Sequence, residues 1–260
     1  MSEDFYIDEK WLAAYFEKDW FDKVISDSSA KDFKFEYPGY GPIELYSDYH
    51  EKMVEFLNKE LTKLSVKPHR LLEIGSSLGR SYYELCKSLS SIRSATLVEP
   101  SQNLVSLFSK IFIKGGLNTF PVLTGNREMA YIDFNTDAQK NSCSQVDLTL
   151  LNSTFDQVQV RPDYFDLVIS SNVIDQCHEP LALVELLKTA TAPDGILVLS
   201  CTYQWNEKYI ENQAPEIKNI NHLFQNGWKL LNETNIPFKV RRHERFWMHF
   251  LSHVSIFQKM

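Results

Sequence analysis

An acidic residue, a glycine turn and a second acidic residue make up the segment of this sequence best suited to hold a ligand. Glu73 lies in an apolar run that leads into Gly75 and Gly79. These glycines permit a tight turn, a close approach of backbone to ligand and close packing of the following helix on a sheet. Glu99 ends the next apolar run, where a carboxylate can accept two hydrogen bonds from a ribose diol. The pattern predicts a nucleoside-cofactor site with Glu99 at an exposed strand end.

The turn favours a cationic cofactor over one that carries phosphates. Its pattern is E-x-G-x-x-x-G, whereas dinucleotide enzymes use G-x-G-x-x-G to place a pyrophosphate on a helix N-terminus. An anion is badly placed beside the Glu73 carboxylate. The segment resembles motif I of the class I S-adenosylmethionine-dependent methyltransferases, whose cofactor carries a sulfonium and an ammonium group. This resemblance covers about residues 70–200 and implies S-adenosyl-L-methionine as the cofactor.

The resemblance assigns cofactor contacts to the turn and to the strand ends beside it. Methyltransferases often place an aspartate next to the adenine, and here that place reads Asn152-Ser153-Thr154, so Asn152 or Ser153 would accept the hydrogen bond. The expected cofactor-binding residues are Glu73, Gly75, Ser76, Gly79, Arg80, Glu99, Pro100, Asn152, Ser153 and Asn172.

Alternating strands and helices must position these residues. The apolar runs that predict strands cover 71–74, 95–98, 146–151, 165–170 and 196–201, and the helical segments between them cover 80–89, 103–113 and 180–190. This alternation predicts an α/β fold with a doubly wound, mostly parallel sheet, which binds ligands outside the carboxyl ends of its strands. Two alternating runs, 238–242 and 246–257, predict antiparallel strands that close the sheet edge.

Two further segments decorate this sheet. Residues 1–65 show apolar residues at helical spacing and no convincing strand, which predicts an N-terminal helical lid over the cofactor cleft. Residues 66–260 would then form the methyltransferase domain. Within it, about residues 114–144 are too long for an ordinary connection between a helix and a strand, so we expect an insertion there.

A narrower resemblance appears in the C-terminal half. The segments 171–175, 203–205 and 236–257 look like the methyltransferase domain of ovothiol-biosynthesis enzymes, which in that family is a 4-mercaptohistidine N1-methyltransferase. The resemblance spans nearly the whole chain and implies N-methylation of a thiohistidine imidazole. An iron-dependent sulfoxide synthase often precedes this domain in the family, and we expect this chain to be the free-standing methylating half or a relative with another small substrate.

Methyl transfer to an imidazole requires an oriented neutral nucleophile and no strong base. The residues expected to fix the imidazole tautomer, and therefore assigned as catalytic, are Asn172, Tyr203, Asp175 and His253. Trp205 is expected to wall the substrate pocket. An amino-acid carboxylate is best clamped by a guanidinium, so Arg242 and Arg245 are the expected substrate contacts.

Composition and charge narrow the classes of function and of partner that remain. The chain has 260 residues, 43% of them hydrophobic, and a net charge of −7, which fits one α/β unit with a small-molecule substrate and argues against nucleic acid. We expect a cytoplasmic protein without a membrane partner, because no apolar run approaches 18 residues and the start is acidic. Four scattered cysteines predict neither zinc nor disulfides, and no metal site is expected. Sequence gives no oligomeric state.

Three rival functions stay open at this point. The run 75–79 also fits G-x-S-x-G, the nucleophile elbow of serine hydrolases, with Ser77 followed by Asp175 and by His249 or His253. A hydrolase would need several strands before the elbow, and the first 65 residues do not supply them. A nicotinamide dehydrogenase would need a third glycine, which this turn lacks. A methyltransferase-like module that binds without turnover is the remaining possibility.

Overall fold

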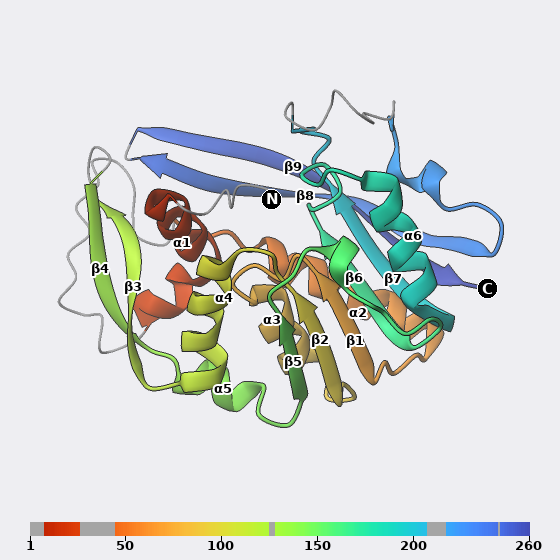
Figure 1. Cartoon of the computed structure of the whole chain (residues 1–260), viewed down its shortest axis with the longest axis horizontal. Helices are drawn as coiled ribbons and strands as arrows, with labels where there is room; N and C mark the ends of the chain where they lie inside the picture. The colour runs from red at the N-terminus through yellow and green to blue at the C-terminus, as the bar shows by residue number, and fades with distance from the viewer. Residues whose placement is uncertain (1–7, 27–44, 125–127, 207–216, 244) are drawn as a thin grey trace.

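The fold is a seven-stranded sheet with helices on both faces (Figure 1). A computed structural model describes residues 8–26, 45–124, 128–206, 217–243 and 245–260. The strands of the sheet lie in the order β5-β2-β1-β6-β7-β9-β8. Their bounds are β1 Arg70–Ile74, β2 Ser94–Val98, β5 Asp147–Leu151, β6 Phe165–Ser171, β7 Thr191–Cys201, β8 Trp228–His243 and β9 Phe246–Lys259.

The sheet confirms the predicted fold class. Strands β5, β2, β1, β6 and β7 run parallel, and β9 lies antiparallel between β7 and β8. The central strands read as near-continuous apolar runs because both of their faces are covered. The C-terminal hairpin is longer than predicted, since β8 begins at Trp228 rather than at residue 238.

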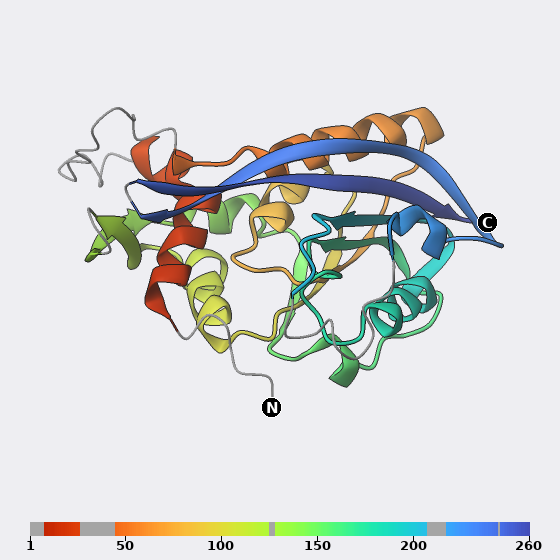
Figure 2. The ribbon, with the colours of Figure 1, turned by 90° about the horizontal axis from the view of Figure 1, so that it is seen from above.

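Each face of the sheet is covered by its own set of helices. Figure 2 shows α2 and α6 on opposite sides of the strands, and the buried apolar residues form one large cluster on each face. The helices are α1 Glu9–Ser26, α2 Tyr49–Leu64, α3 Arg80–Ser88, α4 Gln102–Ser109 with the π-helical turn η4 Lys110–Lys114, α5 Asp137–Ser142 and α6 Pro180–Ala190, with short 3-10 turns η5 Phe155–Gln157 and η6 Ile220–Leu223. No described helix is long and apolar enough to cross a membrane.

The insertion contains an antiparallel hairpin that the sequence reading missed. Strands β3 Leu117–Thr124 and β4 Glu128–Asn135 pair with each other and stand apart from the main sheet. The side chains of Phe120, Ile132 and Phe134 are buried, while Tyr131 is exposed, so the period-2 alternation was present. Pro121 in the first run and the neighbouring glycines concealed it, because both residue types are rare inside strands.

Helix α1 is enclosed on nearly all sides by this hairpin and by the β8–β9 hairpin. Phe16 stacks on Phe120 at 4.5 Å between ring centres, and Ala13 and Ala14 pack with Val240. A helix buried on all sides belongs to the core of a fold. Helix α2 likewise contributes its apolar residues to the main core cluster. Whether residues 1–65 also act as a lid, with a domain boundary after residue 65, stays a prediction.

A buried ion pair ties α1 to both hairpins. The Glu17 carboxylate accepts hydrogen bonds from Arg241 Nε at 3.0 Å, from Arg241 Nη2 at 2.6 Å and from the backbone N–H of Leu123 at 2.6 Å. Arg241 also donates to the Leu123 carbonyl at 2.6 Å. Both charged side chains are almost completely excluded from solvent. Loss of one partner would leave an uncompensated charge in the interior.

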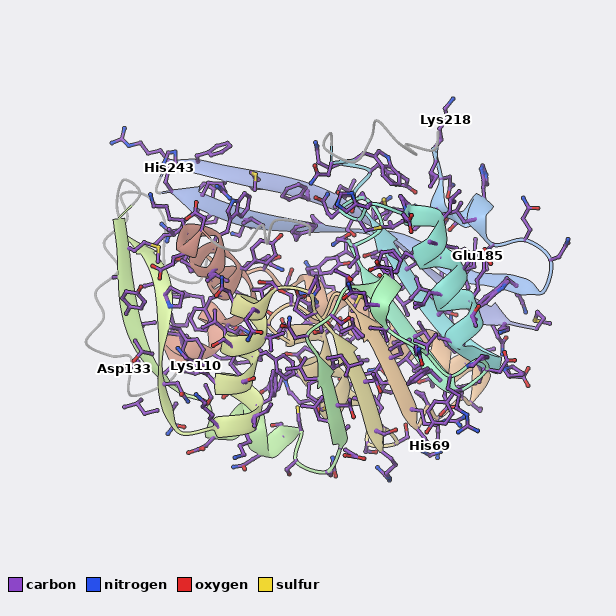
Figure 3. All side chains as sticks on the ribbon, in the orientation of Figure 1. His69, Lys110, Asp133, Glu185, Lys218 and His243 are labelled. Carbon is purple, nitrogen blue, oxygen red and sulfur yellow. The ribbon has the colours of Figure 1, made fainter. Side chains whose placement is uncertain are left out.

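We therefore expect Arg241→Ala to lower the free energy of unfolding by about 3–5 kcal/mol, the typical cost of breaking a buried pair from one side. Chemical denaturation followed by circular dichroism measures this difference. The matched control is Arg245→Ala at the exposed tip of the same hairpin, two residues after His243, which is labelled in Figure 3. This substitution should change stability by less than about 0.5 kcal/mol. Equal effects of the two substitutions would show that the buried pair does not anchor α1.

Candidate active site

The turn after β1 has three residues in the left-handed backbone region at alternate positions. They are Gly75 at φ 81°, Ser77 at φ 50° and Gly79 at φ 76°. A serine in this region is strained, and such strain persists where the surrounding structure enforces it. Helix α1 packs directly on the turn, since Trp20 Nε1 donates to the carbonyl of Leu78 at 3.2 Å.

The two glycines are required by packing within the protein. A Cβ at residue 75 would lie 2.2 Å from Val173 Cγ2, and a Cβ at residue 79 would lie 2.4 Å from Phe108 and 2.6 Å from Phe112. The sequence predicted that Gly79 brings the next helix close to the sheet. Its close neighbours are instead the aromatic side chains of α4 and η4.

Glu99, the predicted ribose partner, is buried and held by backbone amides. Its residue is 4% exposed, which makes the prediction of an exposed strand end wrong. The N–H of Ser77 donates to Oε2 at 2.9 Å and the N–H of Ser101 donates to Oε1 at 2.9 Å. Asn152 Nδ2 donates to the carbonyls of Glu99 and Pro100, each at 3.0 Å. The ends of β2 and β5 and the glycine turn are thus joined around this carboxylate.

The environment of the Glu73 carboxyl favours its protonated form at neutral pH. Burial and the nearby charges of Glu99 and Asp19 raise its pKa to about 8, although Ser81 Oγ donates to its Oε1. The other oxygen, Oε2, is buried and has no hydrogen-bond partner. From its sequence position we had expected a charged carboxylate. Desolvation reverses this, and the group would regain its charge when a cation lies nearby.

Unsatisfied polar atoms concentrate in this turn. Besides Glu73 Oε2, the hydroxyls of Ser76 and Ser77 are buried without a partner. Each such atom costs about 1–3 kcal/mol unless a ligand or water satisfies it. A cofactor that brings hydroxyl, amine and cationic groups to the turn supplies these partners, so the residues fit a cationic nucleoside such as S-adenosyl-L-methionine.

The Arg80 side chain is engaged within the protein, and its predicted contact with the cofactor stays a prediction. The guanidinium is fully buried, and all of the guanidinium N–H groups donate to protein acceptors. It donates to the Asp19 carbonyl, to both oxygens of Asp22 at 2.7 and 3.0 Å and, at 2.8–3.0 Å, to Tyr46 Oη, Glu51 and Glu84. These partners come from α1, α2 and α3, so Arg80 fastens the two N-terminal helices to the start of α3.

Asn172 follows β6 in the left-handed region at φ 55°. Its Oδ1 accepts hydrogen bonds from Ser252 Oγ at 2.6 Å and Ser200 Oγ at 3.1 Å, and Tyr49 Oη lies 2.7 Å from Ser200 Oγ. This network joins the carboxyl ends of β6 and β7 to β9 and α2. Any ligand contact by the Asn172 side chain would come from Nδ2.

Two predicted catalytic residues meet at the end of β7. Tyr203, at φ 58°, places its Oη 2.7 Å from His253 Nδ1. His253 Nε2 in turn lies 2.9 Å from Glu233 Oε2. The sequence reading missed Glu233. The signal was its register in the C-terminal hairpin, where Glu233 opposes Ser255 and Asn235 opposes His253, so all of these side chains lie at neighbouring positions.

Asp175 positions the segment that carries Tyr203. It is almost completely buried, and its Oδ2 accepts hydrogen bonds from the N–H of Thr202 at 2.9 Å and from Thr202 Oγ1 at 2.5 Å. Its carbonyl accepts from the N–H of Asn206 at 3.0 Å. These contacts support the turn after β7 and give Asp175 a role in positioning.

The other predicted residues are dispersed. Trp205 packs against the core on the α6 face. Arg242 lies over the Trp11 ring, 3.1 Å from its centre, and Arg245 is exposed at the hairpin tip. The structure therefore does not gather the two arginines and Trp205 around one point. Ser153 Oγ donates to the carbonyl of Thr154 at 3.2 Å.

The serine-hydrolase reading has no triad to support it. The ring nitrogens of His253 lie at Tyr203 and Glu233, and the Asp175 carboxylate is engaged by Thr202. His249 is exposed on β9. In the described part of the chain, no hydrogen-bonded series of serine, histidine and aspartate includes Ser77.

Comparisons with known proteins place the chain among methyltransferases. A family model described as "Methyltransferase domain" matches residues 47–257. No curated protein matches the sequence. A solved structure of a candidate sarcosine dimethylglycine methyltransferase from Galdieria sulphuraria is similar with 12% identity and a TM-score of 0.53, over 97% of this chain and 98% of that one.

Two further solved structures share the fold. A candidate RNA methyltransferase from Pyrococcus horikoshii has 9% identity and a TM-score of 0.51, over 97% of this chain and 98% of that one. The YcgJ protein from Bacillus subtilis has 12% identity and a TM-score of 0.50, over 80% of this chain and 97% of that one. Identity this low shows the fold alone, and the substrates in these names differ widely.

The raised pKa of Glu73 predicts a pH-dependent stability. Its pKa is about 8 in the folded chain and near 4.5 when unfolded, so the folded state binds one more proton between these values. The free energy of unfolding should fall as pH rises from 5 to 8, by up to about 1.4 kcal/mol per pH unit from this group. Glu73→Gln should remove that dependence, measured by urea denaturation across pH. An unchanged slope in the variant would contradict the assignment.

Proposed function

Since the chain belongs to the methyltransferase domain family, we propose that it transfers a methyl group from S-adenosyl-L-methionine to an imidazole nitrogen of a thiohistidine. The observation that carries the proposal is the juxtaposition of Tyr203 and His253 at 2.7 Å at the end of β7. In the sheet, β7 is next to β6, which Asn172 follows, and β6 is next to β1, which the glycine turn follows. The pair therefore lies at the same edge as Asn172 and this turn. A parallel sheet of this kind binds its ligands at that edge.

The cofactor is proposed to lie across the carboxyl ends of β1, β2 and β5. Glu99 would accept the ribose hydroxyls, Asn152 or Ser153 would meet the adenine, and Asn172 would contact the methionine part. The unsatisfied atoms of Glu73, Ser76 and Ser77 support this placement, with Gly75, Gly79 and Pro100 shaping the turn around it. When bound, the cofactor supplies a methyl group made electrophilic by a sulfonium.

The acceptor is proposed to lie over the ends of β6 and β7. A neutral imidazole is available at pH 7, and the protein need only fix its tautomer and aim one lone pair. Tyr203 Oη and Asn172 Nδ2 supply hydrogen bonds of suitable kind from adjacent strand ends. Asp175 and His253 would act on the acceptor through Tyr203 rather than by direct contact.

An amino-acid acceptor also needs a partner for its carboxylate. Of the two predicted arginines, Arg242 has a buried Nη1 without a hydrogen-bond partner, and burial lowers its pKa. It lies on β8 well beyond Asn235, the residue that opposes His253, roughly 20 Å away at about 3.3 Å per residue, so Arg242 would reach only a substrate that extends along the hairpin. Arg245 lies further along the hairpin, and Trp205 is proposed to wall the pocket.

A small, soluble acceptor fits the charge of the chain. With a net charge of −7, a nucleic-acid substrate would meet repulsion from the protein surface. We also propose a cytoplasmic location for the protein. Another small substrate remains the second candidate, because solved structures with the same fold carry names with very different substrates.

Loss of the Glu99 charge should weaken cofactor binding. In Glu99→Gln the ribose hydroxyls lose a charge-assisted acceptor, which is worth about 1.5–3 kcal/mol, or roughly 10–100-fold in the dissociation constant of S-adenosylhomocysteine. Isothermal calorimetry measures this constant, with circular dichroism to establish that the variant is folded. The matched control is Glu185→Gln on the outer face of α6 (Figure 3), where the side chain is exposed. An unchanged affinity of the folded Glu99 variant would refute the ribose assignment.

The acceptor is tested with radiolabelled S-adenosyl-L-methionine and three compounds: 5-thiohistidine, 4-thiohistidine and histidine. We expect labelled product from a thiohistidine and much less from histidine. The site of methylation is then read by NMR of the product. If S-adenosylhomocysteine binds but none of the three is methylated, the enzyme class stands and the thiohistidine proposal fails.

A further inference from the structure

We propose that Tyr203, His253 and Glu233 form a proton relay from the methyl acceptor to solvent, with Glu233 as the positioning residue for His253. The proposal rests on the proposed function and deepens it. It assigns the site to acceptors that must release a proton as the methyl group arrives, such as an imidazole that bears an N–H. Acceptors without a proton to lose would not need it.

The three residues form a continuous chain of hydrogen bonds that leads outward. Tyr203 Oη lies 2.7 Å from His253 Nδ1, and His253 Nε2 lies 2.9 Å from Glu233 Oε2. The histidine side chain is 14% exposed and the Glu233 side chain 49% exposed. The chain therefore begins at a partly buried tyrosine beside the strand ends and ends at a carboxylate in contact with water.

Each hydrogen-bonding direction follows from the neighbours. His253 and Asn221 both donate to Glu233 and hold its pKa below the ordinary value, so the carboxylate is charged and accepts. His253 Nε2 then carries the hydrogen, and Nδ1 accepts from the Tyr203 hydroxyl. Burial, together with the neighbouring Glu233 and Asp175 carboxylates, raises the pKa of Tyr203, so its hydroxyl keeps its proton. Ser255 Oγ lies 3.3 Å from Nε2.

Tyr203 is held in place at an energetic cost. A non-glycine residue at φ 58° is strained, and such strain persists where surrounding contacts enforce it. Asp175 fixes the preceding Thr202, the N–H of Tyr203 donates to Cys201 Sγ at 3.2 Å, and the N–H of Ile220 donates to Tyr203 Oη at 3.2 Å. The Tyr203 hydroxyl thus donates its hydrogen to His253 and accepts a hydrogen bond from Ile220. Its second lone pair can accept a hydrogen bond from an N–H of the methyl acceptor.

The relay takes up the proton that the methyl acceptor loses during the transfer step. As the bond from methyl to ring nitrogen forms and the bond from methyl to sulfur breaks, the sulfur keeps the electron pair and the ring gains positive charge. The N–H proton on the opposite ring nitrogen passes to Tyr203 Oη, while the hydroxyl proton passes to His253 Nδ1. The resulting imidazolium is stabilised by Glu233 and loses a proton to water. The same hydrogen bond fixes the acceptor tautomer, because the N–H held by Tyr203 leaves the other ring nitrogen with a lone pair.

The relay is tested first without any substrate. In protein labelled with ¹⁵N-histidine, the His253 signals are identified by their loss in His253→Gln, and the tautomer of the ring is measured by NMR. We expect the Nε2–H tautomer in the wild type. In Glu233→Gln this preference should weaken, since a neutral amide can donate to Nε2 as well as accept from it. Glu185→Gln on α6 is the matched control and should leave the tautomer unchanged.

Two NMR outcomes would overturn the relay. One is an Nδ1–H tautomer of His253 in the wild type, and the other is an unchanged tautomer preference in Glu233→Gln. Tyr203→Phe keeps the ring stacked on His253 and removes only the hydroxyl, so the Nε2–H tautomer fixed by Glu233 should persist in this variant. None of these readings depends on the identity of the acceptor.

Activity then connects the relay to catalysis. With an acceptor methylated by the wild type, Glu233→Gln should lower kcat and leave KM nearly unchanged, because the relay acts in the transfer step and not in binding. Glu233→Asp should partly restore kcat. An unchanged kcat in folded Glu233→Gln would reject the relay while leaving the methyltransferase assignment intact. Failure to bind S-adenosylhomocysteine would instead reject the cofactor placement.

Discussion

The burial of the Arg80 guanidinium is the constraint on which the arrangement of the candidate site depends. A charge removed from water must be paired and hydrogen-bonded, and here the partners come from α1, α2 and α3 at once. Arg80 is the first residue of α3 and directly follows the glycine turn. The same side chain therefore fixes where the N-terminal helices pack and where the turn that would hold the cofactor ends. Helix α1 completes this arrangement through Trp20 and the Glu17 ion pair.

The candidate site combines two chemically different halves along one edge of the sheet. The β1–β2 half contains buried acidic and hydroxyl groups with unsatisfied atoms, which suits a ligand that brings positive charge and hydrogen-bond donors. The β6–β7 half contains satisfied networks that end in Asn172 and Tyr203. Both halves hold a non-glycine residue in the left-handed region, Ser77 in the first and Asn172 and Tyr203 in the second. Backbone strain at three neighbouring strand ends marks this edge as the place where function has constrained the fold.

The main sheet and most helices could be predicted from sequence because their signals are local. The apolar runs of β1, β6 and β7 and the helix Pro180–Ala190 follow from periodicity. The roles of Arg80 and Glu99 could not be predicted in this way, because burial depends on α1 and on backbone amides distant in sequence. Glu233 was missed for a related reason: its partner His253 is identified only by the register of the hairpin. The β3–β4 hairpin was concealed by Pro121 within an otherwise alternating run.

The position of α1 has a consequence for how the chain folds during synthesis. Its Glu17 contacts Leu123 and Arg241, which lie 106 and 224 residues further along the sequence. During synthesis, the buried residues of α1 therefore lack these partners until the segment that carries Arg241 has been made. Contacts of such long sequence separation slow folding, because the intervening chain must lose its freedom first. The packing of α1 is thus a late event in folding, after the β8–β9 hairpin has formed.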